Sequence, residues 1–209
     1  MAHINKWTEE SHATDYLAME IPHRSEGEAV LLDCISKGAS RILDLGCGDG
    51  RLLALVLERF PKATGIAVDF SPAMLERARR RFAADKRVEI REHNLDYPLP
   101  ELGSFDTIVS SLAIHHVTDE RKRELYTEVF HLLAPAGVFC NLEHVASPSP
   151  RLHSQFLAAL GKSVESEDPS NKLLDVETQL GWLRAIGFMD VDCYWKWREL
   201  ALLSGVKPE

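Results

Sequence analysis

Residues 42–50 place a short apolar segment directly before a loop that has glycine at every second position. An apolar run from 52 to 60 follows at once and has the composition of a helix. Glycine allows a backbone to turn with positive φ or to approach a ligand closely. A helix start beyond such a turn offers unpaired N–H groups and the positive end of its dipole. The stretch therefore predicts a buried parallel strand, a tight turn and a helix, forming a nucleotide-type site at the carboxyl edge of a sheet.

The spacing of the glycines separates this loop from two common phosphate-binding loops. The dinucleotide fingerprint G-x-G-x-x-G needs its third glycine at the position of Arg51. The phosphate loop G-x-x-x-x-G-K-[ST] occurs nowhere in the chain. The loop instead follows Asp44 and has the acidic form Asp-x-Gly-x-Gly-x-Gly. An NAD-dependent oxidoreductase is therefore disfavoured.

Strands and helices are predicted to alternate along the rest of the chain. Ser71-Pro72 starts a predicted helix, with Ser as the cap and Pro in the first turn. About two residues separate the last two predicted strands, so these strands form an antiparallel hairpin. This order predicts a doubly wound parallel sheet with one antiparallel strand. The predicted strands are 42–45, 65–69, 88–92, 105–111, 138–145, 188–197 and 200–206, and the predicted helices are 26–35, 52–60, 73–82, 119–133, 151–160 and 175–186.

Three features together resemble the class I S-adenosylmethionine-dependent methyltransferases: the loop Asp-x-Gly-x-Gly-x-Gly, Asp69 at the end of the next strand, and the terminal hairpin. The resemblance covers about residues 28–207. It implies an α/β fold: a doubly wound, Rossmann-like sheet of seven strands with the last strand antiparallel and helices on both faces. It also implies a single methyltransferase domain over 1–209, with an N-terminal lid segment at 1–25 and a loop-and-helix insertion at 147–172 near the acceptor site.

The resemblance implies S-adenosyl-L-methionine as the cofactor and S-adenosyl-L-homocysteine as the product. Asp44, Gly46 and Gly48 are expected around the methionine end of the cofactor. Asp69 is expected to bind the ribose hydroxyls, and Phe70 is expected to flank the adenine. The further expected cofactor contacts are Cys47, Gly50, Met74, Asn94, Leu95, Ser110, Tyr16 and Arg24.

Several of these positions leave alternatives open. Asn94 stands where the family usually has Asp, but its amide oxygen still accepts a hydrogen bond from the adenine amino group, as Asp96 also could. Met74 either covers the adenine or packs in the core. Arg24 either pairs with the cofactor carboxylate or is an exposed arginine.

Ionisable residues follow two predicted strands at the edge where ligands bind. His115 and His116 come after the fourth predicted strand, and Glu143 and His144 end the fifth. One histidine, with His115 preferred, is expected as a general base with a near-neutral pKa; packing against the backbone is the alternative. Glu143 and His144 are expected to contribute to an acceptor pocket, and Glu143 is a further catalytic candidate beside His115 and His116. A metal site would need a third ligand beside the histidine pair, and no metal is expected.

Composition narrows the possible partners. The chain has 209 residues, a formal net charge of −8 and a pI of about 5.6. Nucleic-acid and membrane binding are disfavoured because phosphate contacts need Lys and Arg. The basic run 77–87 is interpreted as the solvated face of a helix, with RNA contact as the minor alternative. The four scattered cysteines form no C-x-x-C motif, and neither a signal peptide nor a membrane span is evident, so a cytoplasmic protein is expected.

The predicted reaction is methyl transfer to a small-molecule acceptor by in-line displacement, in which the protein aligns the acceptor and excludes water. The acceptor atom (O, N, S or C) stays open because this fold serves all four. The alternatives are an enzyme like carboxy-S-adenosylmethionine synthase, an RNA-modifying enzyme, and a non-catalytic accessory subunit that binds the cofactor. A monomer or a homodimer is expected.

Overall fold

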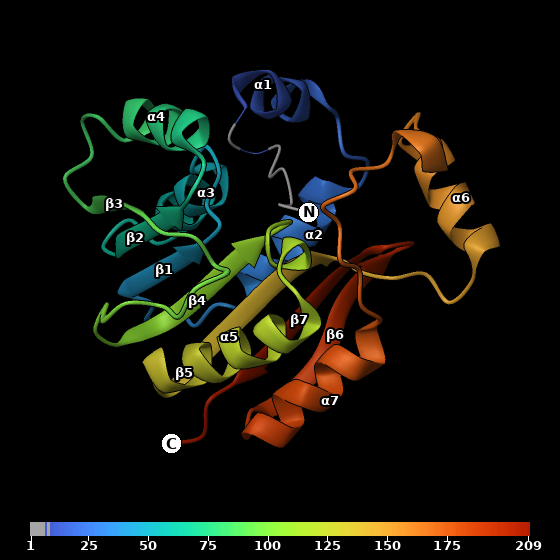
Figure 1. Ribbon diagram of the computed structural model, residues 1–209. Coiled ribbons are helices and arrows are strands. Elements are labelled where there is room, and N and C mark those ends of the chain that lie inside the picture. The colour runs from blue at the N-terminus through green and yellow to red at the C-terminus, as the bar shows by residue number, and fades with distance from the viewer. Residues whose placement is uncertain (1–6, 8) are drawn as a thin grey trace.

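The computed structural model describes Trp7 and residues 9–209, and in this part of the chain seven strands form one sheet. The strand order is β3-β2-β1-β4-β5-β7-β6, and β7 runs antiparallel to both of its neighbours (Figure 1). The other adjacent pairs are parallel. The predicted Rossmann-like sheet is therefore confirmed. The strands are β1 (Arg41–Leu45), β2 (Thr64–Asp69), β3 (Val88–Glu92), β4 (Phe105–Ser111), β5 (Leu133–His144), β6 (Met189–Trp197) and β7 (Leu200–Val206).

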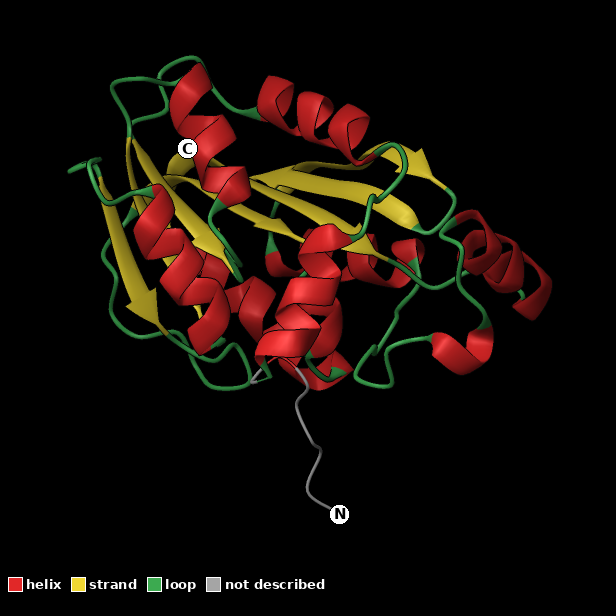
Figure 2. Ribbon diagram, turned by 90° about the horizontal axis from the view of Figure 1, so that it is seen from above, coloured by secondary structure: helices red, strands yellow, loops and turns green. Residues whose placement is uncertain are grey.

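Helices cover both faces of the sheet (Figure 2). Helices α2 and α3 pack on one face, and α5 and α7 pack on the other. Helices α1 and α6 lie at the end of the sheet toward which the β4 arrow points (Figure 1). Across the described residues, no helix combines the length and the apolar character needed to cross a membrane. The helices are α1 (Glu10–Ala18), α2 (Arg24–Cys34), α3 (Arg51–Arg59), α4 (Pro72–Arg81), α5 (Asp119–Leu132), α6 (Pro150–Ala159) and α7 (Val176–Ile186), with short 3₁₀ turns η2 (Ile114–His116) and η3 (Val164–Ser166).

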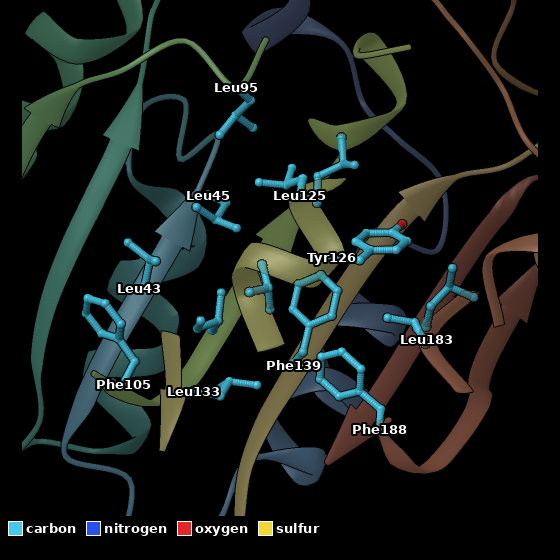
Figure 3. Packing of buried hydrophobic residues seen from close by; sticks show 14 of the residues in the cluster. Leu43, Leu45, Leu95, Phe105, Leu125, Tyr126, Leu133, Phe139, Leu183 and Phe188 are labelled. Atoms are coloured by element: carbon cyan, nitrogen blue, oxygen red, sulfur yellow. The ribbon is translucent and has the colours of Figure 1, made fainter. Parts of the chain in front are cut away.

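Two apolar layers hold the sheet between these helices. On the α5 and α7 side, Tyr126, Phe139 and Phe188 are buried together, and the ring centroids of Tyr126 and Phe139 lie 5.6 Å apart (Figure 3). On the other side, α3 turns Leu53 and Val56 fully into the core. Fully burying such a side chain contributes about 1.5–3 kcal/mol. These layers fix the strand ends, and therefore the position of the loop that follows β1.

Helix α4 begins as the sequence predicts. The Ser71 hydroxyl accepts a hydrogen bond from the Met74 N–H at 3.4 Å, and Pro72 occupies the first turn. Such a cap satisfies one of the free N–H groups at a helix start. It also places the cap of α4 two residues after Asp69, the last residue of β2.

Strand β5 begins at Leu133, whereas the sequence predicts a turn and a strand start at 138. Leu133 pairs with Phe105 across a register shift, and Ala136 has a φ of 59°. The Ala136 N–H donates to the Lys207 carbonyl at 3.0 Å, beyond the end of β7. This distant contact makes an irregular strand start from residues that locally favour a turn.

Residues 10–18 form helix α1, where the sequence predicts only a polar lid segment at 1–25. Ala13 is fully buried, and the Thr14 hydroxyl accepts a hydrogen bond from Arg77 of α4 at 2.9 Å. So short a helix depends on tertiary contacts rather than on its own propensity, which explains the weak sequence signal. Residues 1–6 and 8 of the predicted lid lie outside the described residues. The other element boundaries agree with the predicted ones to within about two residues, the usual uncertainty of helix and strand ends.

Candidate active site

The loop between β1 and α3 has the backbone that its glycines predict. Gly46 and Gly48 have φ of 65° and 54°, in the left-handed region that residues with a side chain rarely adopt. A Cβ atom added to Gly46 would lie 2.2 Å from the Cβ of Ala113, which follows β4. The Cys47 N–H donates to the Val68 carbonyl of β2 at 2.9 Å. The loop is thus held between the ends of β2 and β4 and has no room for a side chain at position 46.

Replacing Gly46 by alanine is expected to lower the free energy of unfolding by about 2–4 kcal/mol, because backbone strain and an overpacked Cβ add together. Gly161 offers a matched control: its φ is 68°, but no described atom lies within 4 Å of its added Cβ. Gly161→Ala should therefore cost only the backbone strain, about 1 kcal/mol. Urea unfolding of both variants measures the difference. Equal losses would contradict the importance of the Ala113 contact.

Asp69 ends β2 beside this loop and is 9% exposed. Its two oxygens accept the N–H groups of Gly48 and Ser71, each at 2.8 Å. Burial raises the pKa of Asp69, and these backbone N–H groups oppose the rise. Because each carboxylate oxygen has a second lone pair, Asp69 can accept further hydrogen bonds from a ligand.

Asp44 of β1 is fully buried, and among the described residues neither of its oxygens meets a hydrogen-bond partner. Burial raises the pKa of Asp44 to about 7, and the Asp69 carboxylate adds to this rise. The Leu53 N–H at the start of α3 opposes the rise electrostatically, although it does not meet the geometry of a hydrogen bond to Asp44. A buried carboxylate without a donor is unfavourable in the free protein. Asp44 is therefore suited to pairing with a cationic group of a ligand.

Two guanidinium groups lie close to the same loop. Glu28 of α2 is buried between Arg24, whose Nε donates to it at 2.9 Å, and Arg51, which also pairs with it. Arg24 further contacts the Tyr16 hydroxyl at 3.5 Å and the Ser111 hydroxyl at 3.4 Å. Arg24 is thus partly buried and paired, so the alternative that it is an exposed arginine is wrong. Nothing in the glycine motif points to Glu28 or Arg51, so the sequence does not reveal them.

These groups line a cavity of about 940 Å³, a volume that includes open solvent at its mouth. The cavity lies at the carboxyl ends of β1 and β2, the edge where the sequence predicts a ligand. The predicted cofactor residues that line it are Tyr16, Arg24, Asp44, Gly46, Cys47, Gly48, Asp69, Phe70, Met74, Asn94 and Leu95.

Two predicted cofactor residues do not line this cavity. Gly50 precedes α3, where an added Cβ would lie 2.5 Å from the Phe82 ring. Ser110 is fully buried, and its hydroxyl donates to the Leu45 carbonyl at 2.8 Å. Its neighbour Ser111 lines the cavity instead, since successive residues of a strand face opposite sides of the sheet.

A second cavity adjoins the first and holds about 1370 Å³, open solvent included. Within the described chain, both cavities are lined by Trp7, Tyr16, Leu112 and His116. The Trp7 ring centroid lies 5.0 Å from that of Tyr16 and 5.5 Å from that of His116. Leu112 has a φ of 55°, a strained conformation of the kind that gathers at functional sites. Two ligands could therefore meet end to end at this junction.

His115 lines the second cavity and is 5% exposed. Its Nδ1 lies 2.7 Å from Oε1 of Glu143. Burial, helped by the charges of His144 and Lys122, lowers the pKa of His115 well below 6.5, in contrast to the near-neutral pKa that the sequence suggests. The ring is thus neutral. When Glu143 carries its charge, Nδ1 of His115 donates the ring proton to it, which leaves the lone pair on Nε2.

Glu143 is fully buried behind His115 and, in the described part of the chain, lines neither of these two cavities. Burial raises the pKa of Glu143, while the His144 N–H and the Asn141 amide oppose the rise. The Asn141 amide donates to Glu143 at 3.3 Å and to the Tyr126 hydroxyl at 3.2 Å. The Tyr126 hydroxyl donates to the amide oxygen of Gln179 at 2.6 Å. Glu143 therefore acts on the cavity only through His115, and a buried polar network holds it in place.

The other histidines around the second cavity have partners of their own. Nδ1 of His116 lies 3.0 Å from the Ser170 hydroxyl, and burial lowers the pKa of His116. Nε2 of His144 lies 2.9 Å from a carboxylate oxygen of Glu199. Among the residues described, no three or more His, Cys, Asp or Glu side chains are arranged to hold a metal ion.

Comparisons with known proteins decide the family. Residues 42–137 match a family model described as a methyltransferase domain. A demethylmenaquinone methyltransferase from Clavibacter sepedonicus is 33% identical over 189 residues, which cover 80% of this chain and 74% of that protein. The chain is a class I S-adenosylmethionine-dependent methyltransferase.

Solved structures show the same fold. An O-methyltransferase family protein from Burkholderia thailandensis matches with a TM-score of 0.71 and 23% identity. The match covers 90% of the present chain and 56% of the Burkholderia chain. Human N-acetylserotonin methyltransferase in complex with S-adenosylmethionine has a TM-score of 0.70 and 17% identity over 98% and 58% of the two chains. The present chain thus spans little more than half the length of these two solved chains. Its cofactor is S-adenosylmethionine.

Proposed function

We propose that this methyltransferase transfers a methyl group from S-adenosylmethionine in the first cavity to a small-molecule acceptor in the second. The observation that carries the proposal is the junction of the two cavities at Trp7, Tyr16, Leu112 and His116. A donor and an acceptor that meet at such a junction are aligned and shielded from water. From here on, the first cavity is called the cofactor cavity and the second the acceptor cavity.

The charges of the cofactor cavity match the two charged groups of an amino acid. We assign Asp44 to the ammonium group, because its buried oxygens meet no donor among the described residues. Arg24 is assigned to the carboxylate, since a guanidinium binds carboxylates with two parallel hydrogen bonds. Asp69 is assigned to the ribose hydroxyls, and Phe70 and Met74 to the two sides of the adenine.

The adenine edge is assigned to Asn94 and Leu95, which also line the cofactor cavity. The Asn94 amide oxygen accepts the Asp96 N–H at 2.9 Å. An amide oxygen has two lone pairs, so one remains for the adenine amino group. The Leu95 N–H is assigned to a ring nitrogen.

The affinity for S-adenosylhomocysteine is expected to rise with pH through about 7. Asp44 has a pKa of about 7 in the free protein, so below that pH it must release a proton to pair with the ammonium. By linkage, the affinity should fall about tenfold between pH 8 and pH 6. Titration calorimetry in buffers of different ionisation enthalpy measures both the affinity and the released proton. Asp44→Asn should remove this pH dependence, and a variant that kept the wild-type slope would contradict the assignment.

His115 is the proposed general base for an acceptor that carries a proton on its reacting atom. When bound, S-adenosylmethionine supplies a methyl group on a sulfonium sulfur, and the carbon–sulfur bond breaks as the acceptor bonds to the methyl carbon. Nε2 of the neutral His115 takes the acceptor proton. Glu143, 2.7 Å from Nδ1, stabilises the imidazolium that results. His116 stacks beside His115 with ring centroids 4.1 Å apart and shapes the junction.

The alternatives have less support. A carboxy-S-adenosylmethionine synthase needs a cation beside the reacting methyl, for which the sequence offers Arg24 or Arg151. Arg151 is exposed on α6 and is not among the described residues that line the cofactor or the acceptor cavity. Arg24 lines the cofactor cavity, but it is paired with Glu28 and assigned to the cofactor carboxylate. An RNA-modifying enzyme needs free basic residues, whereas Arg80 and Arg81 of the basic run form ion pairs within the protein. A non-catalytic subunit would have no use for an open acceptor cavity.

Two measurements test the proposed function in order. Calorimetric titration with S-adenosylhomocysteine tests the cofactor cavity, and absence of binding at ~100 μM, far above a micromolar dissociation constant, would contradict it. A screen of small metabolites with S-adenosylmethionine, read as release of S-adenosylhomocysteine, tests the acceptor cavity. Release only in the presence of RNA or a protein would overturn the small-molecule assignment.

A further inference from the structure

The acceptor cavity has two chemically different parts. One part carries His115, His116 and His144, and the ring centroid of His115 lies 4.1 Å from that of His116 and 5.3 Å from that of His144. The side toward α6 is apolar, and most of its side chains belong to one small buried cluster. The residues of this apolar wall are Leu112, Phe156, Leu157, Leu160 and Leu200. A ligand that fits both parts is apolar over most of its length and polar at the end that meets the histidines.

Acidic side chains outnumber cations on the cavity wall. Asp15, Glu167 and Asp168 line the cavity, and Lys162 is the single Lys or Arg that does so among the described residues. Burial raises the pKa of Asp168, but hydrogen bonds from the Ser170 N–H and hydroxyl outweigh this effect and hold the pKa below its ordinary value. Asp168 is therefore an anion. His115 and His116 add no positive charge, since burial lowers the pKa of both rings.

The nearby cations are engaged elsewhere. The Lys122 ammonium donates to Asp119 at 2.8 Å and to the Lys172 carbonyl, and the Lys172 ammonium donates to the His116 carbonyl. Neither Lys122 nor Lys172 is among the described residues that line the acceptor cavity. The cofactor cavity is different, because Arg24 and Arg51 both line it. The cofactor cavity therefore presents guanidinium groups to an anion, although Asp44, Asp49, Asp69 and Asp96 line it as well, whereas the described lining of the acceptor cavity has no guanidinium group.

The rim that carries the acids is fixed to the body of the protein. His153 of α6 contacts Glu199 at 3.0 Å through Nδ1 and Glu167 at 3.0 Å through Nε2. Burial lowers the pKa of His153, but the carboxylates of Glu199 and Glu167 raise it by more. The ring therefore holds a proton between these two carboxylates more readily. Nε2 of His12 lies 3.3 Å from Asp168. These pairs hold Glu167 and Asp168 beside the cavity, so their carboxylates are a built feature of its wall.

We infer that the acceptor is an uncharged molecule with an apolar body and a hydroxyl group at one end. This inference rests on the proposed function and narrows its substrate class. The hydroxyl carries the proton that Nε2 of His115 removes, and the apolar body covers the wall toward α6. A carboxylate or phosphate would lose its hydration and gain one lysine at most. It would also face three carboxylates, of which Glu167 and Asp168 are paired with His153 and His12.

Three matched probes test this selectivity on the full chain saturated with S-adenosylhomocysteine. The probes are 4-butylphenol, 4-(4-hydroxyphenyl)butanoate and 4-(3-aminopropyl)phenol, which share a phenol and a chain of similar length but differ in end charge. Calorimetry should show that 4-butylphenol binds at least about tenfold more tightly than the carboxylate, a difference that corresponds to one unpaired charge at a partly buried site. Binding needs no methyl transfer, so this readout is independent of catalysis.

Three variants locate the selectivity in the cavity. Asp15→Lys should raise the affinity for the carboxylate probe about two- to fivefold, the scale of an exposed charge, and leave 4-butylphenol unchanged. Leu160→Asp should weaken 4-butylphenol about tenfold, because a carboxylate then interrupts the apolar wall. Val164→Asp is the matched control: Val164 is 52% exposed and does not line the acceptor cavity, so the affinities should not change.

Each other ranking overturns the inference. Equal or tighter binding of the carboxylate probe shows that the wall does not reject anions. Tighter binding of the ammonium probe identifies an amine acceptor instead. Failure of 4-butylphenol to bind shows that the cavity takes no such molecule. Failure of S-adenosylhomocysteine to bind is seen before any probe is added and counts against the proposed function; the probe ranking is then measured on the free protein.

Discussion

Replacing His115 by alanine is expected to lower kcat by about 10²–10⁴-fold, the range that a positioned general base contributes. The affinity for S-adenosylhomocysteine should change little, because His115 lines the acceptor cavity and not the cofactor cavity. At saturating S-adenosylmethionine, the wild-type kcat should stay level as the pH falls toward about 6.5, since burial lowers the pKa of His115 well below that value. A base is active when neutral, so the rate falls only at more acidic pH. Initial rates across pH, with an acceptor found by the screen, measure both effects.

Two further variants give this prediction its controls. His131→Ala removes an exposed histidine of α5 and should leave kcat unchanged. Glu143→Gln keeps a hydrogen-bonding group beside Nδ1 but removes the charge that stabilises the imidazolium. It should lower kcat by about tenfold and move the acidic limb of the profile to lower pH, because a lost carboxylate lowers the pKa of its histidine. Full activity of a folded His115→Ala variant would make His115 a packing residue.

Replacing Asp69 by alanine is expected to weaken S-adenosylhomocysteine binding by about 1–3 kcal/mol, the scale of lost hydrogen bonds to a charged group. Besides its proposed ribose contact, Asp69 accepts the N–H groups of Gly48 and Ser71 at 2.8 Å each. The variant therefore loses both a ligand contact and two acceptors that order the glycine loop. Calorimetry of the wild type and the variant measures the change in affinity.

Thermal unfolding separates these two losses. Asp69→Asn retains one carbonyl oxygen and should recover part of the loop stability but less of the affinity. Asp33→Ala removes an exposed carboxylate from α2 and should change neither quantity. A lower melting temperature with an unchanged affinity would leave Asp69 as a loop residue without a ribose contact.

The fold could be predicted where the signal lies within a few neighbouring residues. The strand before Gly46, the cap at Ser71 and the terminal hairpin each follow from local geometry, and the structure confirms them. The failures depend on distant contacts. Strand β5 begins early because Ala136 donates to Lys207, and α1 forms where Ala13 is buried and Thr14 meets Arg77 of α4.

The candidate site, like the fold, could be predicted only where its residues follow from local sequence patterns. Asp44 and Asp69 stand at strand ends, and parallel strands bring such residues to one edge of a sheet. Ser111 rather than Ser110 lines the cavity, because the face that a strand residue takes depends on its register with β1 and β5. Arg51 approaches Glu28 only when α2 and α3 pack together, so no motif could reveal it.

The sequence by itself determined the order of the elements, the left-handed loop after β1 and the presence of carboxylates and histidines at the strand ends. Glycine spacing and hydrophobic periodicity are local properties, so they need no knowledge of distant contacts. Only the tertiary structure decided the protonation of Asp44 and His115 and the pairing of His115 with Glu143, 28 residues further along the chain. Burial and charge pairing arise between segments that folding brings together, and these set a pKa.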